Sequence, residues 1–474
     1  MPERFDLAIV GAGAAGLIAA DFALELGARV ALLEHERIGG DCTWTGCVPS
    51  KSLVKVAAIA AHVRSASRFG ITVTEPVIDL ARVREYLREC IEHIYAPTAP
   101  EALRARGLTV KLGATRFINP HTLEVGGDRL QARRVLLCTG AAPRPPAVSG
   151  IDQVPYLTYR DVFENDRLPD SLVVIGGGPL GCEIAQCYQR LGARVTLVAP
   201  RLLPRAEEQA SELLSRAFAR EGLQHVRARA ESVRDDGGRI RVQTGAGEAV
   251  GEVLLAAVGR MPNLHGLELE RAGVRYSERG IDVNARLQTT ARHIYAAGDV
   301  IGGPQFSHLA GWQAFLAVRN AMLPGAGDVV PAALPEVTYT VPEVAHTGLT
   351  ETQARERFGR AVRVASLDLA HVDRAVSEGD GHGFIKLVAN RSGRVLGATL
   401  VAERAGEALA EVTLAIASRL RLRDLALTIH PYPTYNSAIQ LLASRMATRE
   451  ALSGFKGTLA RRLSRWSLGS GPIA

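Results

Sequence analysis

The sequence contains no uninterrupted apolar run approaching 18 residues, so it offers no candidate for a helix that crosses a bilayer. Its first residues, MPERFDLAIVGAG, lack the basic segment, apolar stretch and cleavage site of a secretory signal. Low-complexity tracts are also absent, and a composition of 47% hydrophobic and 22% charged residues is typical of a globular protein. We therefore expect a cytoplasmic protein, and its 474 residues predict two to four domains.

Basic blocks and metal-type cysteine spacings are absent as well. The net charge is +7, but the basic residues, mostly arginine, are scattered along the chain, which disfavours a nucleic-acid partner. The six cysteines include no CxxC pair of the kind that binds zinc, so no metal site is expected. In a reducing cytoplasm they are not expected to form a structural disulfide framework, and a pair that does oxidise is a candidate for catalysis.

The first forty residues are typical of a βαβ unit. We expect a strand over Asp6–Val10, a helix ending near Leu26 and a second strand over Arg29–Leu33. A glycine-rich turn between strand and helix suits a dinucleotide, because its glycines allow a tight turn, close approach to a pyrophosphate and close helix packing. An acid at the end of the second strand can accept hydrogen bonds from a ribose. The predicted ligand-binding residues here are Gly11, Gly13, Gly16 and Glu34.

The same pattern occurs a second time. Strands are expected over Ser171–Ile175 and Arg194–Val198, on either side of a second glycine turn and helix. The predicted glycines of this turn are Gly176, Gly178 and Gly181. The chain is therefore expected to bind two dinucleotides.

The second unit differs from the first at the ribose position. Counting from Gly176 as from Gly11, the place of Glu34 is taken by Ala199, and the following loop carries Arg201 and Arg205. The missing acid and the two nearby arginines favour a ribose that carries a 2′-phosphate. NADPH is therefore the predicted coenzyme, with NADH as the other possibility. The alternative interpretation is that both arginines are solvated loop charges.

A cysteine pair lies between the two units, in the segment GGDCTWTGCVPSKS. Cys42 and Cys47 are separated by four residues, and a helix is expected from Lys51 to His62, with Pro49 in its first turn. Cys47 is thereby placed near a helix N-terminus, where the helix dipole lowers a thiol pKa and stabilises the thiolate.

With these motifs the chain resembles the pyridine nucleotide-disulfide oxidoreductases, over nearly its whole length, and in particular their mercuric reductase-like members. The resemblance also rests on Leu137-Cys-Thr139-Gly140, Val258-Gly259-Arg260-Met-Pro262-Asn263, Ile294-Tyr-Ala-Ala-Gly298-Asp299 and the segment from Val341 to Thr350. It implies an α/β fold with two Rossmann-like domains, for FAD and NAD(P), and an α+β C-terminal dimerisation domain. The expected segments are 1–148 and 269–334 for FAD, 149–268 for NAD(P)H and 335–474 for dimerisation.

The resemblance also implies roles for single residues. Electrons from the nicotinamide would pass through FAD to a Cys42–Cys47 disulfide, with Cys47 beside the flavin and Cys42 attacking an acceptor by thiol exchange. Asp299 would bind the flavin ribitol, and Lys51 would pair with Glu183 beside the flavin ring. Thr139, Gly140, Gly259 and Gly298 would complete the cofactor sites. The protein is expected to be a homodimer whose C-terminal domain completes the partner's active site.

One departure from the family concerns the acceptor side. Disulfide-reducing relatives have His-Pro-Thr followed by a glutamate three residues on, whereas here Tyr432 replaces the histidine and Ser437 the glutamate. A tyrosine at this place resembles mercuric reductase, and soft thiolates suit Hg(II). No cysteine follows Cys187, however, so the C-terminal cysteine pair of many mercuric reductases is missing. The acceptor is therefore expected to be a metal ion or small molecule, with disulfides and quinones as alternatives.

Two further features keep alternatives open. His430 could replace the missing acid/base, or be a structural histidine. The segment from Phe455 to Trp466 combines an apolar face with Lys456, Arg461, Arg462 and Arg465, which suits either a membrane surface or packing on the protein itself, the latter being favoured. A flavin oxidase, a quinone reductase and a thiol redox sensor with little turnover are the competing functions.

Overall fold

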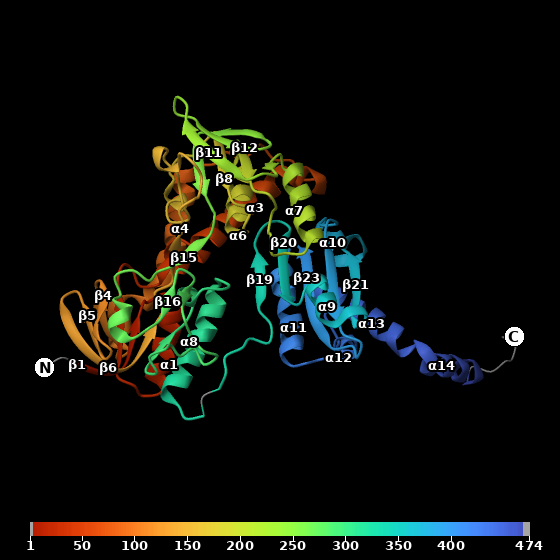
Figure 1. The fold of residues 1–474 in the computed structure, drawn as a ribbon. Helices are drawn as coiled ribbons and strands as arrows, with labels where there is room; N and C mark the ends of the chain where they lie inside the picture. The colour runs from red at the N-terminus through yellow and green to blue at the C-terminus, as the bar shows by residue number, and fades with distance from the viewer. Residues whose placement is uncertain (1–2, 326, 468–474) are drawn as a thin grey trace. The chain divides into compact units, whose positions relative to one another are not determined.

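The protein is described by a computed structural model that covers residues 3–325 and 327–467, with the backbone alone described at 454–456 and 465–467. The chain forms two compact units (Figure 1). The first contains the residues up to Pro200 and Gly222–Val330, and the second contains Arg201–Glu221 and the residues from Pro331 onward. This division is coarser than the four predicted segments, whose boundaries stay predictions.

The larger sheet of the first unit has the order β3-β2-β1-β6-β5-β4, with β18 paired to β6. Strand β1 lies parallel to β2 and β6, and all five residues of β2 are buried, as expected for a parallel strand covered on both faces. The predicted strands of the first βαβ unit are confirmed. The bounds are β1 (Glu3–Val10), β2 (Val30–Glu34), β3 (Thr109–Leu112), β4 (Thr115–Asn119), β5 (Thr122–Val125), β6 (Asp128–Leu137) and β18 (Ile294–Ala296).

Helices α1 (Ala14–Glu25) and α8 (Ser307–Met322) lie side by side in this unit (Figure 1). Small residues allow the approach, since a Cβ on Gly311 of α8 would lie 2.3 Å from Cδ1 of Ile18 on α1. The alanines of α1 at positions 15, 19, 20 and 23 are buried, so the helix packs closely rather than through long side chains. The remaining helices of this part are α2 (Gly40–Trp44), α3 (Cys47–Ser65), α4 (Leu80–Tyr95) and α5 (Pro100–Ala105).

A second parallel sheet, ordered β10-β9-β8-β14, belongs to the same unit. Its strands β8 and β9 have the predicted bounds, and α6 connects them, so the second βαβ unit is confirmed. The bounds are β8 (Ser171–Ile175), α6 (Pro179–Leu191), β9 (Arg194–Val198), β10 (Gln224–Val226) and β14 (Val253–Ala256). A three-stranded sheet is formed by β11 (Ala230–Asp235), β12 (Ile240–Thr244) and β13 (Gly247–Gly251). Two further sheets are two-stranded: one pairs β7 (Ala141–Pro143) with β15 (Arg260–Pro262), and the other pairs β16 (Tyr276–Ser277) with β17 (Gly280–Ile281).

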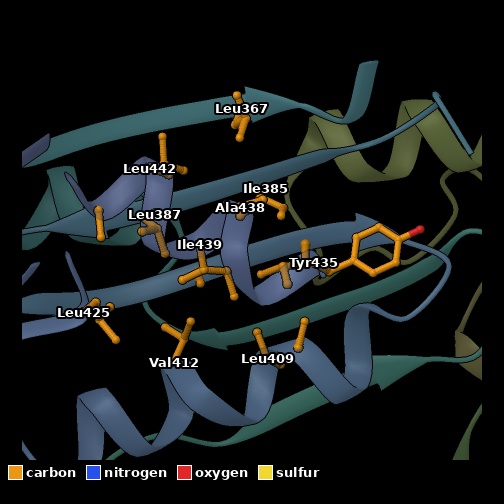
Figure 2. Packing of buried hydrophobic residues seen from close by; sticks show 14 of the residues in the cluster. Leu367, Ile385, Leu387, Leu409, Val412, Leu425, Tyr435, Ala438, Ile439 and Leu442 are labelled. Carbon is orange, nitrogen blue, oxygen red and sulfur yellow. The ribbon is translucent and has the colours of Figure 1, made fainter. Parts of the chain in front are cut away.

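The second unit is built on an antiparallel sheet of order β19-β20-β23-β22-β21. Its core is an aliphatic cluster between the sheet and helices α11 and α13, closed at one end by the buried ring of Tyr435 (Figure 2). The bounds are α7 (Glu208–Arg220), β19 (Pro335–Thr338), β20 (Glu343–Gly348), α9 (Glu351–Phe358), β21 (Arg363–Asp368), α10 (Asp373–Glu378), β22 (Phe384–Ala389), β23 (Val395–Ala402), α11 (Ala405–Ala417), α12 (Leu422–Leu427), α13 (Tyr435–Ala451) and α14 (Gly454–Ser467).

Helix α14 contains the predicted basic segment. Its Leu459 and Leu463 are 46% and 54% exposed, whereas the side chains predicted at 455, 456, 465 and 466 lie outside the described residues. Across positions 3–325 and 327–467, none of the helices is long and apolar enough to span a membrane.

Candidate active site

The two predicted glycine turns have the same geometry. Gly11 and Gly176 have φ angles of +99° and +118°, and a Cβ on either would lie 2.3 Å from a backbone oxygen, of Cys138 and Ala257 respectively. A Cβ on Gly16 or Gly181 would in turn lie about 2 Å from the oxygen of that first glycine. Both contacts leave room for no side chain, so the backbone itself requires glycine at these positions.

The middle glycine of each turn is placed differently. Gly13 and Gly178 are the N-cap residues of α1 and α6, and neither has a side chain that could cap the helix. No atom lies within 4 Å of a Cβ on Gly178, and only the Cα of Gly40, at 3.9 Å, lies near one on Gly13. Uncapped first-turn amides beside open space suit the phosphates of a dinucleotide.

Glu34 ends β2 beside the first turn. Its Oε2 accepts a hydrogen bond of 2.7 Å from the amide of Ala12, and its Oε1 accepts one of 2.8 Å from the amide of Glu36. The carboxylate is thus fixed in orientation, and each oxygen retains a lone pair for a ribose hydroxyl. The matching Ala199 of the second unit is buried and offers no such group.

The two arginines expected at the second ribose have different surroundings. Nη2 of Arg201 donates to the carbonyl oxygen of Ala206 at 2.7 Å, while its Nε is buried without a partner among the described residues. Arg205 lies 3.5 Å from the carboxylate of Glu336 and its side chain is 57% exposed. Because its side chain is exposed, Arg205 is the more accessible of the two arginines to a phosphate. Both arginines belong to the second unit, whereas Ala199 belongs to the first.

The cysteine pair occupies two consecutive helices. Cys42 lies in the short helix α2, and Cys47 is the first residue of α3, after the N-cap Gly46. The predicted position at a helix N-terminus is confirmed. A Cβ on Gly46 would lie 2.7 Å from the carbonyl oxygen of Asp41, so glycine lets the chain turn back tightly between the cysteines. The two sulfurs are free thiols in this structure.

The pKa values of the two thiols are shifted in opposite directions. The hydrogen bond from Cys42 is the main cause that lowers the pKa of Cys47, to about 6, and Ser307 and the charge of Lys51 lower it further. The same hydrogen bond, followed by burial, raises the pKa of Cys42 above its ordinary value. Cys47 is therefore the thiolate at neutral pH, with the hydrogen bond from Cys42 as the largest of these causes. The effect of the helix dipole stays a prediction.

Ser307 is a site residue that the sequence analysis missed. It begins α8, and its Oγ lies 3.3 Å from Sγ of Cys47. No motif marks this serine, and 260 residues separate it from Cys47. Only the packing of α8 in the first unit brings the two together.

Lys51 and Glu183 form the ion pair that the resemblance implied. Nζ of Lys51, on α3, lies 2.8 Å from Oε2 of Glu183, on α6, whose side chain is 3% exposed. The two helices pack together in the first unit. A buried carboxylate needs such a partner, because an isolated one would lose its hydration.

Three predicted motifs meet around Arg260. The side chains of Thr139 and Asn263 each donate a hydrogen bond to the other residue's backbone carbonyl. Oγ1 of Thr139 donates to the Asn263 carbonyl at 2.8 Å, and Nδ2 of Asn263 donates to the Thr139 carbonyl at 2.9 Å. The Asn263 amide also donates to the carbonyl of Gly140, at 3.0 Å. Arg260 donates to Asp299 at 2.6 Å, and burial raises the pKa of that carboxyl.

The glycines of these motifs serve the backbone. Gly140, Gly259 and Gly298 have φ angles of +68°, +106° and +80°, which other residues rarely adopt. Gly298 directly precedes Asp299 and is the N-cap of the short helix that begins there. The three segments thus converge on one region of the first unit.

Tyr432 and His430 lie in the second unit, on the loop before α13. Tyr432 is 73% exposed and its hydroxyl donates to Asp373, which raises its pKa. His430 is nearly enclosed, with 6% of its side chain exposed; Nε2 lies 2.6 Å from Glu411 and Nδ1 lies 2.8 Å from the carbonyl of Thr428. Both partners are acceptors, and a neutral imidazole carries one N–H, which can be donated to only one of them at a time.

Ser437 occupies the place of the family's glutamate, and its hydrogen bonds stabilise the N-terminus of α13. Its amide donates to Thr434 Oγ1 at 3.0 Å and its hydroxyl donates to the Thr434 carbonyl at 2.7 Å, which caps α13. In the described part of the chain, no three His, Cys, Asp or Glu side chains gather as they would around a metal ion.

Comparison with known proteins places these features in a wider group. Residues 5–314 match the profile of the pyridine nucleotide-disulphide oxidoreductases, and residues 334–443 match the dimerisation domain of the same group. The chain is 38% identical to a mercuric reductase of Streptomyces lividans over 93% of this chain and 95% of that protein. It is 34% identical to a dihydrolipoyl dehydrogenase of Thermus scotoductus over 94% of this chain and 98% of that protein.

Solved structures agree with this assignment. LpdA from Mycobacterium tuberculosis is similar with a TM-score of 0.85 and 28% identity, over 94% of this chain and 99% of that one. The HOCl-induced flavoprotein disulfide reductase RclA from Escherichia coli is similar with a TM-score of 0.82 and 27% identity, over 93% and 99%. The likeness therefore extends through both units of the chain.

Proposed function

We propose that this chain, which belongs to the pyridine nucleotide-disulphide oxidoreductase family, is an NADPH-dependent flavoenzyme that passes electrons through Cys42 and Cys47 to Hg(II) bound by thiolates. Family membership makes it a flavoprotein oxidoreductase with a dimerisation domain, and enzymes of the family use FAD and NAD(P)H. The observation that carries the choice of acceptor is the replacement of an imidazole by the exposed phenol of Tyr432, while His430 is enclosed with both nitrogens engaged.

The first unit fits FAD by the chemistry of its donors. The uncapped amides of α1 suit the pyrophosphate, the fixed carboxylate of Glu34 suits a ribose, and Asp299 suits the ribitol hydroxyls. Thr45, between the two cysteines, has a buried hydroxyl without a partner among the described residues, as expected where a bound group completes a site. Bound FAD supplies the two-electron step between nicotinamide and sulfur.

The cysteines can hold Hg(II) once their disulfide is reduced. Cys47, with a pKa of about 6, binds the ion as a thiolate at neutral pH. Cys42 loses its proton when it binds as the second ligand, because a metal ion replaces the proton of a coordinating thiol. The two thiolates of the incoming Hg(II)–thiol complex leave as the cysteines bind, and one of them takes up this proton. Two electrons from the nicotinamide then convert Hg(II) to Hg(0) and leave both sulfurs as thiolates. No proton has to be taken from an incoming thiol.

Disulfide exchange makes a demand that this site meets less well. It requires a base that accepts the thiol proton of one sulfur and returns it to another. Tyr432 has a raised pKa and is a poor base near neutrality. The nitrogens of His430 lie at hydrogen-bond distance from Glu411 and from the carbonyl of Thr428, so in this arrangement both are already engaged within the second unit. These contacts support a metal ion over a disulfide.

One observation favours a second candidate, a disulfide reductase of the dihydrolipoyl dehydrogenase type. His430 and Glu411 form an imidazole–carboxylate pair at 2.6 Å, with Glu411 on α11 instead of at the position that Ser437 holds. If this loop rearranges in the assembled enzyme, the pair supplies an acid/base. A relative with that activity is 34% identical.

An acceptor screen tests the proposal. NADPH-reduced protein is mixed with Hg(II)–thiol complexes, lipoamide, glutathione disulfide and quinones, with Cys42→Ser as the matched control. We expect turnover with Hg(II) that Cys42→Ser abolishes. Fast lipoamide turnover would instead establish the dihydrolipoyl dehydrogenase type, steady NADPH consumption with oxygen alone an oxidase, and stalling with every acceptor a redox sensor.

The dimerisation domain implies a homodimer. We further propose that Tyr432 of one subunit acts at the cysteine pair of the other, and that Arg205 contributes to binding the 2′-phosphate of NADPH. Its exposure and the lack of an acid at Ala199 support the second point, although NADH would also be accommodated if Arg205 keeps its contact with Glu336.

A further inference from the structure

A charged network adjoins the cysteine pair and joins residues of three sequence motifs to Tyr159, which lies in none of them. Nη2 of Arg260 lies 2.6 Å from Oδ2 of Asp41, and its Nη1 lies 2.6 Å from Oδ2 of Asp299. The phenol of Tyr159 donates to the same oxygen of Asp41 at 2.6 Å. Arg260 also lies over the ring of Tyr159, 5.2 Å from its centroid. All four residues belong to the first unit.

The network joins parts of the chain that are far apart in sequence. Asp41 is the residue before Cys42 in α2, Arg260 begins β15, and Asp299 begins a short helix. Tyr159 lies between the two βαβ units, 118 residues from Asp41. The helix that carries Cys42 is thereby tied to the region where Asp299 is proposed to hold the flavin.

The charges of the network balance. Arg260 contacts two carboxylates, and a second guanidinium, of Arg160, lies 3.7 Å from the other oxygen of Asp41. The side chains of Arg260 and Asp41 are each 26% exposed, and that of Asp299 is 12% exposed. Ion pairs this enclosed are screened far less than surface pairs, so they can fix the position of α2.

Besides the network, α2 has contacts at both of its ends. Its N-terminus rests on the first glycine turn, where a Cβ on Gly40 would lie 2.9 Å from the Cα of Gly13. The helix is only five residues long and none of them is buried. At its C-terminal end, Nε1 of Trp44 donates to the carbonyl of Ile38 at 2.8 Å, and the centroid of the Trp44 ring lies 4.9 Å from that of the Tyr95 ring. The charged network at Asp41, the residue before Cys42, therefore acts together with these contacts to set where the Cys42 thiol lies.

We propose that Asp41 and Tyr159 are positioning residues that, through Arg260, hold the Cys42 thiol against the sulfur of Cys47. This inference rests on the proposed role of the two cysteines as the redox pair. Its consequence follows from the contact already described: Cys42 stabilises the Cys47 thiolate by a hydrogen bond, so displacement of α2 weakens that bond. The reduced pair then loses stability relative to the disulfide.

The test uses Tyr159→Phe, which removes one hydroxyl from the network, and Asp41→Asn, which removes its charge. The matched control is Tyr276→Phe, because Tyr276 also donates to a carboxylate in the first unit, that of Glu270, but on the surface. The rate at which iodoacetamide alkylates Cys47 is measured against pH by mass spectrometry, in reduced holoenzyme. The fraction of disulfide is then measured in glutathione redox buffers.

In Tyr159→Phe and Asp41→Asn we expect the alkylation midpoint of Cys47 to rise from about 6 toward the ordinary thiol value, with Asp41→Asn giving the larger change. A rise of one pKa unit corresponds to about a tenfold change in the equilibrium. The disulfide fraction should increase in parallel, and Tyr276→Phe should match the unmodified protein in both measurements.

Two results would overturn the inference. One is an unchanged alkylation profile in both variants with their FAD content intact. The other is loss of FAD from both without a change in the profile, which would make the network a cofactor support only. If the unmodified protein itself shows no thiol titrating near pH 6, the proposed redox role of the pair fails, and that failure is visible before any variant is compared.

Discussion

Lys51 and Glu183 form an ion pair of 2.8 Å between α3 and α6, with the side chain of Glu183 buried and that of Lys51 38% exposed. The two charges have opposite effects on Cys47, since Lys51 lowers its pKa and Glu183 raises it. The pair thus contributes to the acidity of the thiol as well as to the packing of the two helices.

The first prediction concerns this opposition. Lys51→Met should raise the pKa of Cys47, and Glu183→Gln should lower it, because each removes one of the two opposing charges. Alkylation rates across pH 4–10 measure both shifts. Each change also removes the ion pair between the two helices, and we expect a loss of about 1–3 kcal/mol in unfolding free energy, less than for a fully buried pair because Lys51 is partly solvated. Shifts in the same direction would contradict the electrostatic account.

The two cysteines should also differ in pH dependence. A lowered pKa means that Cys47 is a thiolate above about pH 6 and loses reactivity as the pH falls through that value. Cys42, with a raised pKa, should remain protonated throughout the neutral range. In flavin-loaded protein, Cys42→Ser should show a long-wavelength absorbance band without reduction, whereas Cys47→Ser should show none after reduction. The reverse pattern would exchange the roles of the cysteines.

Coenzyme preference should respond to Arg205. Arg205→Ala is expected to weaken NADPH binding by about 1.5–3 kcal/mol, the range for a hydrogen bond to a charged group, and to leave NADH binding unchanged. Arg216→Ala, which removes an exposed arginine of α7, is the control. Steady-state KM values for both coenzymes measure the effect. Equal efficiency of the unmodified protein with NADPH and NADH would contradict the preference.

The acceptor side can be converted by substitution. Tyr432→His with Ser437→Glu should raise lipoamide and glutathione disulfide turnover by about 10²-fold or more, since general acid–base catalysis typically contributes 10²–10⁴. The cap of α13 should survive, because glutamate is a favoured residue at this position of a capping box. Flavin reduction by NADPH serves as the control and should not change. The proposal is refuted if the unmodified protein already turns over lipoamide tens of times per second.

The shared active site predicts complementation between subunits. Chains carrying Tyr432→Phe and chains carrying Cys42→Ser are co-expressed with different affinity tags, and mixed dimers are purified through both tags. Each mixed dimer has one site with both residues intact, so we expect about half of the unmodified activity. Activity no higher than the mean of the two parental dimers would show that Tyr432 does not act on the partner subunit.

The sequence alone determined the parts of this protein that depend on local spacing. Gly11 and Gly16, or Gly176 and Gly181, are required by backbone contacts within a few residues and the strand beside them, so their pattern is legible in the chain. The position of Cys47 at the start of a helix is likewise local, because Gly46 and the residues after it set the helix N-terminus.

Only the tertiary structure decided which distant side chains meet. Ser307 lies against Cys47 across 260 residues, and Tyr159 lies against Asp41 across 118. Glu411, on α11, lies against His430 on the loop before α13. None of these contacts has a spacing that a sequence could reveal, because each depends on the packing of separate elements within one unit. The resulting hydrogen bonds set the acidity of Cys47 and occupy both nitrogens of His430, and acidity and proton transfer depend on which groups come within about 3 Å.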